Sequence, residues 1–186
     1  MKDNKGIEDF LLQLKNHGEK NDIPNISLTN ARFLRDLILL KQPKNILEIG
    51  TANGFSTINF AIECQKFWWH IDTIEFSQNS YDRAEENIQG ADLGTYVTQH
   101  FWNALDLIPK MDKKYDFIFI DGMKRRTKDF FELSYPLLRS RWIMIIDDVI
   151  LYEEKMKNLY DVLANNDIVY NIIPIDVHDG VIMIIK

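Results

Sequence analysis

The sequence predicts an α/β domain with a mostly parallel β-sheet and helices on both faces. The chain has 186 residues, which suffices for one domain with a single sizeable core. From about Asn45 onward, short β-rich runs alternate with amphipathic helical stretches, the pattern of βαβ units. Only a few residues, among them Asp179-Gly180, separate the last two runs, which permits an antiparallel hairpin and excludes a parallel crossover.

Seven apolar runs are expected to form the strands. The fourth and fifth are nearly continuous in Phe, Ile and Met, which is typical of central strands covered on both faces. The strand with Pro174 is expected at the sheet edge, because proline cannot donate a ladder hydrogen bond. In chain order the runs are Asn45–Ile49, Trp69–Glu75, Tyr96–His100, Tyr115–Asp121, Trp142–Asp147, Val169–Ile175 and Val181–Ile185. Six strands reached by crossovers and an antiparallel seventh describe the methyltransferase variant of the Rossmann-like sheet.

Two helical segments precede the first strand, at about Ile7–His17 and Leu28–Leu40. We therefore expect one domain over residues 1–186, with an N-terminal helical cover (1–44) and a Rossmann-like core (45–186). The cover could pack on the sheet, close over a ligand or form the contact of a homodimer.

Composition limits the class of protein. With 46% hydrophobic and 27% charged residues the chain reads as an ordinary globular protein, and no apolar run approaches the ~20 residues of a membrane helix. No secretory signal is visible, and Cys64 is the only cysteine, which excludes a disulfide framework and a cysteine zinc site within the chain. We expect a cytoplasmic protein. The net charge of −6 argues against a large nucleic-acid surface but permits a local basic patch.

The first strand is followed by a glycine turn. Gly50 and Gly54 lie between the strand and a helix predicted at Phe55–Ile62, and Glu48 lies at the strand's end. The chain must reverse sharply here, and its backbone must approach a ligand more closely than a Cβ allows. Two glycines four apart would also suit a tight turn with no ligand.

An acidic residue ends the second strand. Glu75 comes 25 residues after Gly50, close to the ~20 expected when a carboxylate accepts hydrogen bonds from a ribose. The rival interpretation is a solvated carboxylate, but the combination favours a nucleoside. A turn that binds NAD would have a glycine at the position of Ala52. The carboxylate of Glu48 disfavours a negatively charged pyrophosphate but tolerates a positively charged sulfonium. S-adenosylmethionine is therefore preferred over a nicotinamide cofactor.

The residues Asn45–Thr57 resemble the first motif of the metal-dependent O-methyltransferases, the family of catechol and caffeoyl-CoA methyltransferases with their bacterial relatives. The resemblance extends from about Ile23 to the C-terminus. It implies that Glu48, Gly50 and Ser56 line the methionine end, that Glu75 holds the ribose, and that Asn103 and Ala104 lie beside the adenine. Gly54 and Asp121 complete the predicted cofactor site.

Two further strands end in acid, at Asp121 and at Asp147-Asp148. If these strands are neighbours, the three carboxylates converge in one crevice and repel each other unless a cation lies between them or some are protonated. Each aspartate alone would be an ordinary strand end or cap. Oxygen ligands favour a hard ion, Mg²⁺ first, with Ca²⁺ or Mn²⁺ as alternatives.

The family resemblance continues here. Asp121–Lys124 is similar to its Asp-x-x-Lys motif, and Asp147-Asp148 to its Asp-Asn pair. This implies that Asp121, Asp147 and Asp148 bind the metal and that Lys124 is the general base, with a pKa lowered by the cation. Without the resemblance, Lys124 would read equally well as a surface lysine. Asp148 departs from the family, because it replaces the usual asparagine and adds a negative charge.

The expected reaction is methyl transfer to a hydroxyl of a small catechol-like or phenolic acceptor. The basic run Lys124–Lys128 beside the metal site hints at an anionic acceptor, and some bacterial relatives methylate a hydroxylated uridine of tRNA. Trp102 could stack on a base, but at this spacing it is expected in the core. His178, near the last hairpin, could reach the acceptor. A protein that binds S-adenosylmethionine without transferring its methyl group is the non-catalytic alternative.

Overall fold

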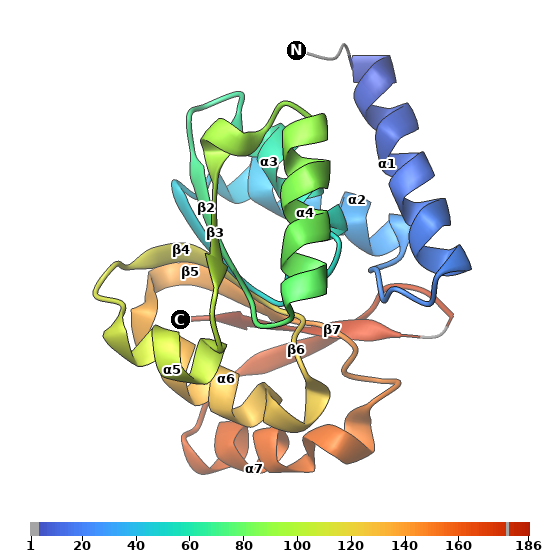
Figure 1. The fold of residues 1–186 in the computed structure, drawn as a ribbon. Coiled ribbons are helices and arrows are strands. Elements are labelled where there is room, and N and C mark those ends of the chain that lie inside the picture. Colours follow the sequence, from blue (N-terminus) through green and yellow to red (C-terminus); the bar gives the residue numbers. More distant parts are fainter. Residues whose placement is uncertain (1–3, 178) are drawn as a thin grey trace.

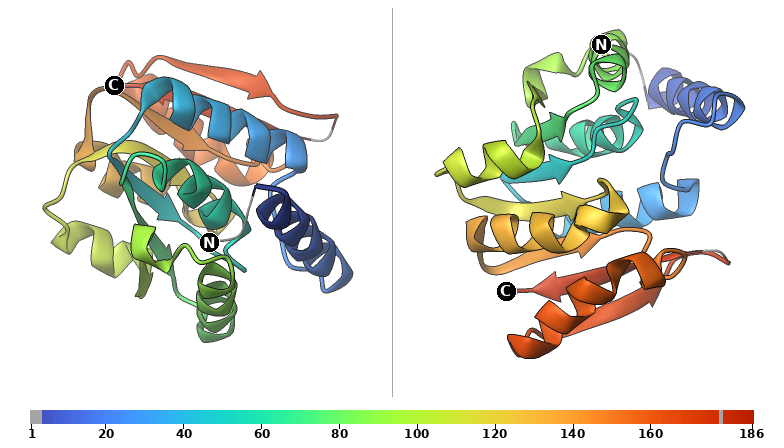
Figure 2. Two further views of the ribbon diagram at one scale, coloured as in Figure 1. Left: turned by 90° about the horizontal axis from the view of Figure 1, so that it is seen from above. Right: turned by 60° about the horizontal axis from the view of Figure 1, so that its bottom comes forward.

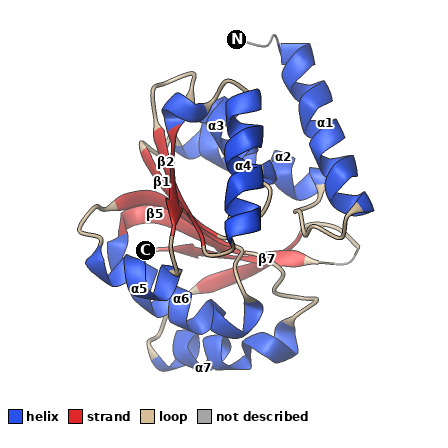
Figure 3. Ribbon diagram, in the orientation of Figure 1, coloured by secondary structure: helices blue, strands red, loops and turns tan. Residues whose placement is uncertain are grey.

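The structure, a computed structural model, describes residues 4–177 and 179–186, in which a seven-stranded sheet lies between two layers of helices (Figure 1, Figure 3). The strands are β1 (Asn45–Ile49), β2 (His70–Glu75), β3 (Val97–Phe101), β4 (Tyr115–Ile120), β5 (Leu138–Ile146), β6 (Tyr170–Pro174) and β7 (Gly180–Ile185). Their order across the sheet is β3-β2-β1-β4-β5-β7-β6. β7 is antiparallel to both neighbours and the other pairs are parallel, which confirms the predicted Rossmann-like sheet. His178 lies outside the described residues.

The strand bounds match the predicted runs closely except in β5. This strand begins at Leu138, well before the predicted Trp142, and its first part pairs with Tyr115 before the register shifts. After the buried Leu138 come three polar, exposed residues that carry no apolar signal, and the first of them, Arg139, pairs with Asp116 at 2.5 Å. The strand with Pro174 forms the sheet edge, as predicted.

The helices form two layers. They are α1 (Asn4–Lys20), α2 (Leu28–Lys41), α3 (Phe55–Cys64), α4 (Gln78–Gly90), α5 (Ala104–Leu107), α6 (Thr127–Ser134) and α7 (Lys157–Asn165). α1 to α4 lie on one side of the sheet and α5 to α7 on the other (Figure 1, Figure 2). Among the described residues, no helix combines the length and the apolar character needed to cross a bilayer.

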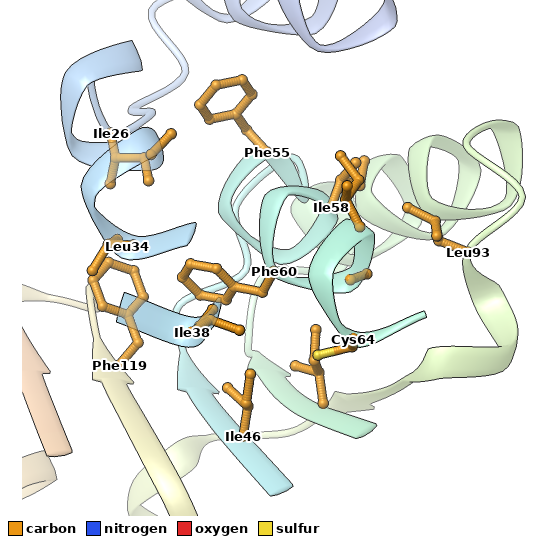
Figure 4. Close-up of a cluster of buried hydrophobic side chains, with 14 of the residues drawn as sticks. Ile26, Leu34, Ile38, Ile46, Phe55, Ile58, Phe60, Cys64, Leu93 and Phe119 are labelled. Atoms are coloured by element: carbon orange, nitrogen blue, oxygen red, sulfur yellow. The ribbon is translucent and has the colours of Figure 1, made fainter. Parts of the chain in front are cut away.

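The N-terminal helices join the core on the first face of the sheet. Leu34 and Ile38 of α2 are fully buried and lie next to Phe60 of α3 and Phe119 of β4 (Figure 4). The two phenyl rings meet edge to face at 5.4 Å. Ser27 caps α2 by accepting a hydrogen bond from the backbone N–H three residues later at 3.0 Å. The helical cover therefore packs on the sheet, one of the three roles considered for it.

The parallel strands bring their carboxyl ends together at one edge of the sheet. The N–H of Gly50 donates to Ile74 of β2 at 3.1 Å, and the N–H of Asp121 donates to Ile49 of β1 at 2.9 Å. The N–H of Asp147 in turn donates to Ile120 of β4 at 3.0 Å. The residues that follow β1, β4 and β5 are thus neighbours, where ligands bind in open α/β sheets.

Candidate active site

A cavity of about 1020 Å³ opens at the carboxyl ends of the central strands. The predicted site residues on its wall are Gly50, Glu75, Asn103, Ala104, Asp121, Lys124 and Asp148. The loop Asp22–Pro24 between α1 and α2 also lines it, so the N-terminal segment borders the ligand space as well as covering the sheet. A cavity of this size accommodates a nucleoside cofactor together with a small acceptor.

The glycine turn has the backbone geometry that its sequence suggested. Gly50 has φ +100°, and a Cβ there would lie 2.5 Å from the carbonyl oxygen of Asp121. Gly54 has φ +84° and precedes α3. Both positions therefore require glycine, one for close approach to β4 and both for the left-handed backbone.

Glu75 ties the glycine turn to the second strand. One carboxylate oxygen accepts from the N–H of Ala52 at 3.0 Å, and the other accepts from the N–H groups of Phe76 and Ser77 at 3.0 and 2.9 Å. The carboxylate is therefore held rigidly at the wall of the cavity. It lies where the sequence predicted a ribose contact.

Glu48 lies behind the wall of the cavity. Its side chain is 0% exposed and accepts hydrogen bonds from Ser56, Thr57 and Thr73 at 2.6, 2.5 and 2.7 Å. Burial raises the pKa of Glu48 to about 7, although these three hydrogen bonds oppose the shift. Neither Glu48, Ser56 nor Gly54 lines the cavity, so in this structure they support the turn from inside.

The loop after β3 contributes Trp102, Asn103 and Ala104 to the wall of the cavity. Asn103 caps α5 by accepting a hydrogen bond from the N–H of Leu105 at 3.1 Å, and Ala104 is buried beside it. Trp102 is 51% exposed and lines the cavity, so the expectation that it belongs to the core is wrong. The apolar character of the side chain did not indicate burial here, because this loop leaves the sheet directly beside the cavity.

The three predicted metal ligands come together. Carboxylate oxygens of Asp121, Asp147 and Asp148 lie within 4.8 Å of one another. Asp147 is the most buried of the three, and Asp148 has a left-handed backbone, φ +61°, that directs the chain away from β5. Burial, reinforced by the charges of its neighbours, holds the pKa of Asp147 well above its usual range. Burial also raises the pKa of Asp148, to about 6.

Lys124 lies among these carboxylates. Its Nζ is 2.5 Å from Asp121 and 2.6 Å from Asp148. Burial alone would lower the pKa of Lys124, but the charges of the two carboxylates and the hydrogen bonds they accept outweigh it and raise the pKa. Without a bound cation, the shift is therefore opposite to the one expected for a base beside a metal.

Several residues of the site escaped the sequence analysis. Asn30 of α2 donates from Nδ2 to Asp147 at 2.8 Å across 117 positions of the chain. Arg83 of α4 and Lys155, in the turn before α7, also line the cavity. No local pattern marks Asn30, Arg83 or Lys155, because only the folded sheet brings their elements to the same edge.

Comparison with known proteins identifies the family of the chain. A model of the O-methyltransferase family matches residues 4–186. A catechol O-methyltransferase of Niastella koreensis is 32% identical over 149 residues, which cover 77% of this chain and 67% of that protein. A catechol O-methyltransferase of Mycobacterium tuberculosis is 29% identical over 132 residues, covering 69% and 60%.

The fold is shared with solved members of that family. The O-methyltransferase from Bacillus cereus in complex with SAH superposes with a TM-score of 0.84 at 25% identity, covering 96% of this chain and 91% of that one. A seven-stranded sheet with an antiparallel last strand is the architecture of class I methyltransferases. The chain belongs to the O-methyltransferase family, which confirms the predicted enzyme class.

Proposed function

We propose that the chain transfers a methyl group from S-adenosylmethionine to a hydroxyl of a small catechol-like acceptor with the help of a divalent cation. One observation carries the proposal: a single cavity joins the glycine turn and Glu75 to Asp121, Lys124 and Asp148. The cofactor site and the carboxylate site are therefore close enough to act on one substrate. We also propose that residues 1–186 act as one domain, because α2 packs on α3 and the loop before it borders the cavity.

The cofactor would occupy the part of the cavity beside β1, β2 and the loop after β3. Glu75, already fixed by three backbone N–H groups, is placed to accept hydrogen bonds from the ribose hydroxyls. The adenine would lie between Ala104 and the exposed ring of Trp102, which offers an apolar face. Gly50 would leave room for the methionine portion.

The carboxylate cluster fits a hard divalent cation. Its donors are all oxygen, and their spacing lets one ion contact three residues. When bound, such a cation would supply positive charge that lowers the pKa of an acceptor hydroxyl. Asp121, Asp147 and Asp148 would hold it.

Lys124 is the proposed acceptor of the hydroxyl proton. If Asp121 and Asp148 bind the proposed cation, Lys124 loses the two contacts that raise its pKa. Its burial then favours the neutral amine. Its Nζ would take the proton of the acceptor hydroxyl. Bound S-adenosylmethionine would supply the methyl group, with the electron pair of its broken S–CH₃ bond remaining on sulfur as the O–CH₃ bond forms.

The rim of the cavity supports an acceptor that carries a negative charge. Arg125 and Lys155 are exposed, and both line the cavity on the side of Asp148 and Tyr152. The Nζ of Lys155 lies 4.4 Å from the centre of the Tyr152 ring, which holds it at the mouth. A carboxylated catechol would place its ring near Tyr152 and its carboxylate between the two cations.

Methyl transfer with labelled S-adenosylmethionine tests the proposal. A neutral catechol, a carboxylated catechol and hydroxyuridine-containing tRNA serve as acceptors, each with and without chelator. We expect chelator-sensitive transfer that is fastest with the carboxylated catechol, and loss of transfer in Asp121→Ala. Full activity in chelator would contradict the metal, and transfer to tRNA alone would contradict the small acceptor. Cofactor binding by calorimetry without transfer to any of them would favour a non-catalytic protein.

A further inference from the structure

A second cavity, of about 210 Å³, adjoins the first at the carboxylate cluster. Asp148 lines both cavities, whereas Asp147 lines only the smaller one. Asn30 from α2 and Asp179 from the turn before β7 also line it, and its other polar lining residues are Asn25, Ser27 and Asp176. The proposed catalytic mechanism uses neither Asn30 nor Asp179, so their polar groups need another explanation.

Asp179 presents one oxygen to the backbone and one to the cavity. Its Oδ1 accepts from the N–H groups of Ile150, Leu151 and Gly180 at 3.0, 3.3 and 2.6 Å. Its Oδ2 is buried and has no hydrogen-bond donor among the described residues. The carboxyl groups of Asp179 and Asp148 line the same small cavity. Two carboxylates that share a cavity of this size repel each other unless a proton or a cation lies between them.

Asn30 supplies an independent indication of a ligand. The side chain is 5% exposed, and its Nδ2 donates to Asp147 at 2.8 Å. When Asp147 is ionised, as it must be to bind a cation, that bond fixes the orientation of the amide, because a carboxylate can only accept. The Oδ1 atom is then left buried without a partner among the described residues. A buried carbonyl oxygen without a partner costs about 1–3 kcal/mol, so a bound group that uses it is favoured.

The charge of the cluster exceeds what one cation neutralises. Asp121, Asp147, Asp148 and Asp179 would carry four negative charges if all were ionised, as cation ligands are, and Lys124 forms ion pairs with Asp121 and Asp148. The formal charge of these five side chains would then be about −3. One divalent ion in the proposed metal site would reduce it to about −1.

We propose that the smaller cavity binds a second hard cation, of the calcium class, between Asp147, Asp148, Asp179 and the Oδ1 of Asn30. Carboxylate and amide oxygens are the ligands such ions take, and Ca²⁺ tolerates the irregular arrangement that residues from three separate elements provide. Water in the cavity would complete the coordination. The site shares Asp147 and Asp148 with the proposed catalytic metal but does not depend on methyl transfer.

Manganese binding to the chelator-stripped protein, measured by equilibrium dialysis, tests this site. The wild type is expected to bind about two ions, because Mn²⁺ accepts the same oxygen ligands as Mg²⁺ and Ca²⁺. Asp179→Asn should bind about one, since the asparagine keeps Oδ1 for the backbone but removes the charge at Oδ2. Asp121→Asn should also bind about one, at the other site. Asp161→Asn, a variant of an exposed aspartate on α7, is the control and should bind as the wild type does.

The outcomes separate the two sites. Unchanged stoichiometry in Asp179→Asn overturns the second cation, whether the wild type binds one ion or two. Loss of an ion in Asp179→Asn but not in Asp121→Asn would overturn the catalytic metal and leave the second cation standing. As a second measurement, Ca²⁺ alone should raise the melting temperature of Asp121→Asn but not of the Asp121→Asn/Asp179→Asn double variant. Asn30→Ala should weaken this Ca²⁺ binding about tenfold, as expected for one lost ligand.

Discussion

Glu48 gives the folded protein a stability that depends on pH. The side chain is 0% exposed, and burial raises its pKa from 4.5 to about 7. A carboxyl group whose pKa is raised on folding contributes stability below the unfolded pKa, and that stability is lost as the pH rises through the folded pKa. The shift of about 2.5 pKa units corresponds to about 3 kcal/mol, most of it lost between about pH 5 and pH 8.

Glu48→Gln removes this dependence. The amide keeps an oxygen that can accept from Ser56 or Thr57 and, like the protonated acid, carries no charge. We therefore expect the variant to be close to the wild type in stability at about pH 5 and more stable than the wild type at about pH 8, with a difference between these pH values of about 2–3 kcal/mol. Groups common to both proteins cancel in this comparison.

Urea unfolding followed by tryptophan fluorescence at several pH values measures the difference. Glu85→Gln, which removes a carboxylate from the exposed face of α4, is the matched control for the loss of one negative charge. A wild-type minus Glu48→Gln difference that stays constant from about pH 5 to pH 8 would refute the argument. A difference that favours the wild type at high pH would show that the ionised form of Glu48 is the stabilising one.

Three further changes test the turn, the cofactor site and the rim. Gly50→Ala should destabilise the protein by about 1–3 kcal/mol, because it combines a positive φ with a Cβ 2.5 Å from a carbonyl oxygen. Gly90→Ala, whose Cβ would meet nothing closer than 3.8 Å, should leave the melting temperature unchanged or higher; equal losses in both variants would contradict this reasoning. Glu75→Ala should weaken S-adenosylmethionine binding about tenfold or more in calorimetry, and an unchanged affinity would remove Glu75 from the ribose site. Lys155→Glu should raise KM for a carboxylated catechol at least about fivefold but change KM little for a neutral one; equal effects on both would argue against an anionic acceptor.

The fold was largely predictable because its signals are local. Most strands are short, largely apolar runs, and the short link that ends at Asp179 determines the antiparallel direction of β7. The start of β5 was not predictable in this way, since the residues after Leu138 are polar and Arg139 is held by a charge pair with Asp116. Strand pairing there depends on a neighbour distant in sequence, which periodicity cannot reveal.

The same distinction applies to the candidate site, where residues with a local sequence signal were predictable and residues that depend on distant contacts were not. Asp121, Asp147 and Asp148 were recognisable because each follows a buried strand, and parallel strands bring such ends together. Asn30 was not recognisable, since its contact with Asp147 joins a helix and a strand end far apart in the chain. The position of Glu48 behind the cavity wall was equally hidden, because a strand-end glutamate looks the same in sequence whether it faces a ligand or three hydroxyl groups.

Asp148, which stands where the family resemblance leads us to expect an asparagine, affects Lys124 in two opposing ways. In this structure it is one of two carboxylates that hold the Lys124 ammonium, and an asparagine could not form that ion pair. The extra charge therefore strengthens the ion pairing of Lys124 with the carboxylates, and a cation that binds there must displace Lys124 from them. The same charge strengthens attraction for a cation by the Coulomb term. A singly charged ammonium gains less from each carboxylate than a divalent ion does, so on charge alone an aspartate at this position would favour the proposed metal over Lys124. Lys124 would then be released from Asp148 only when that metal is bound.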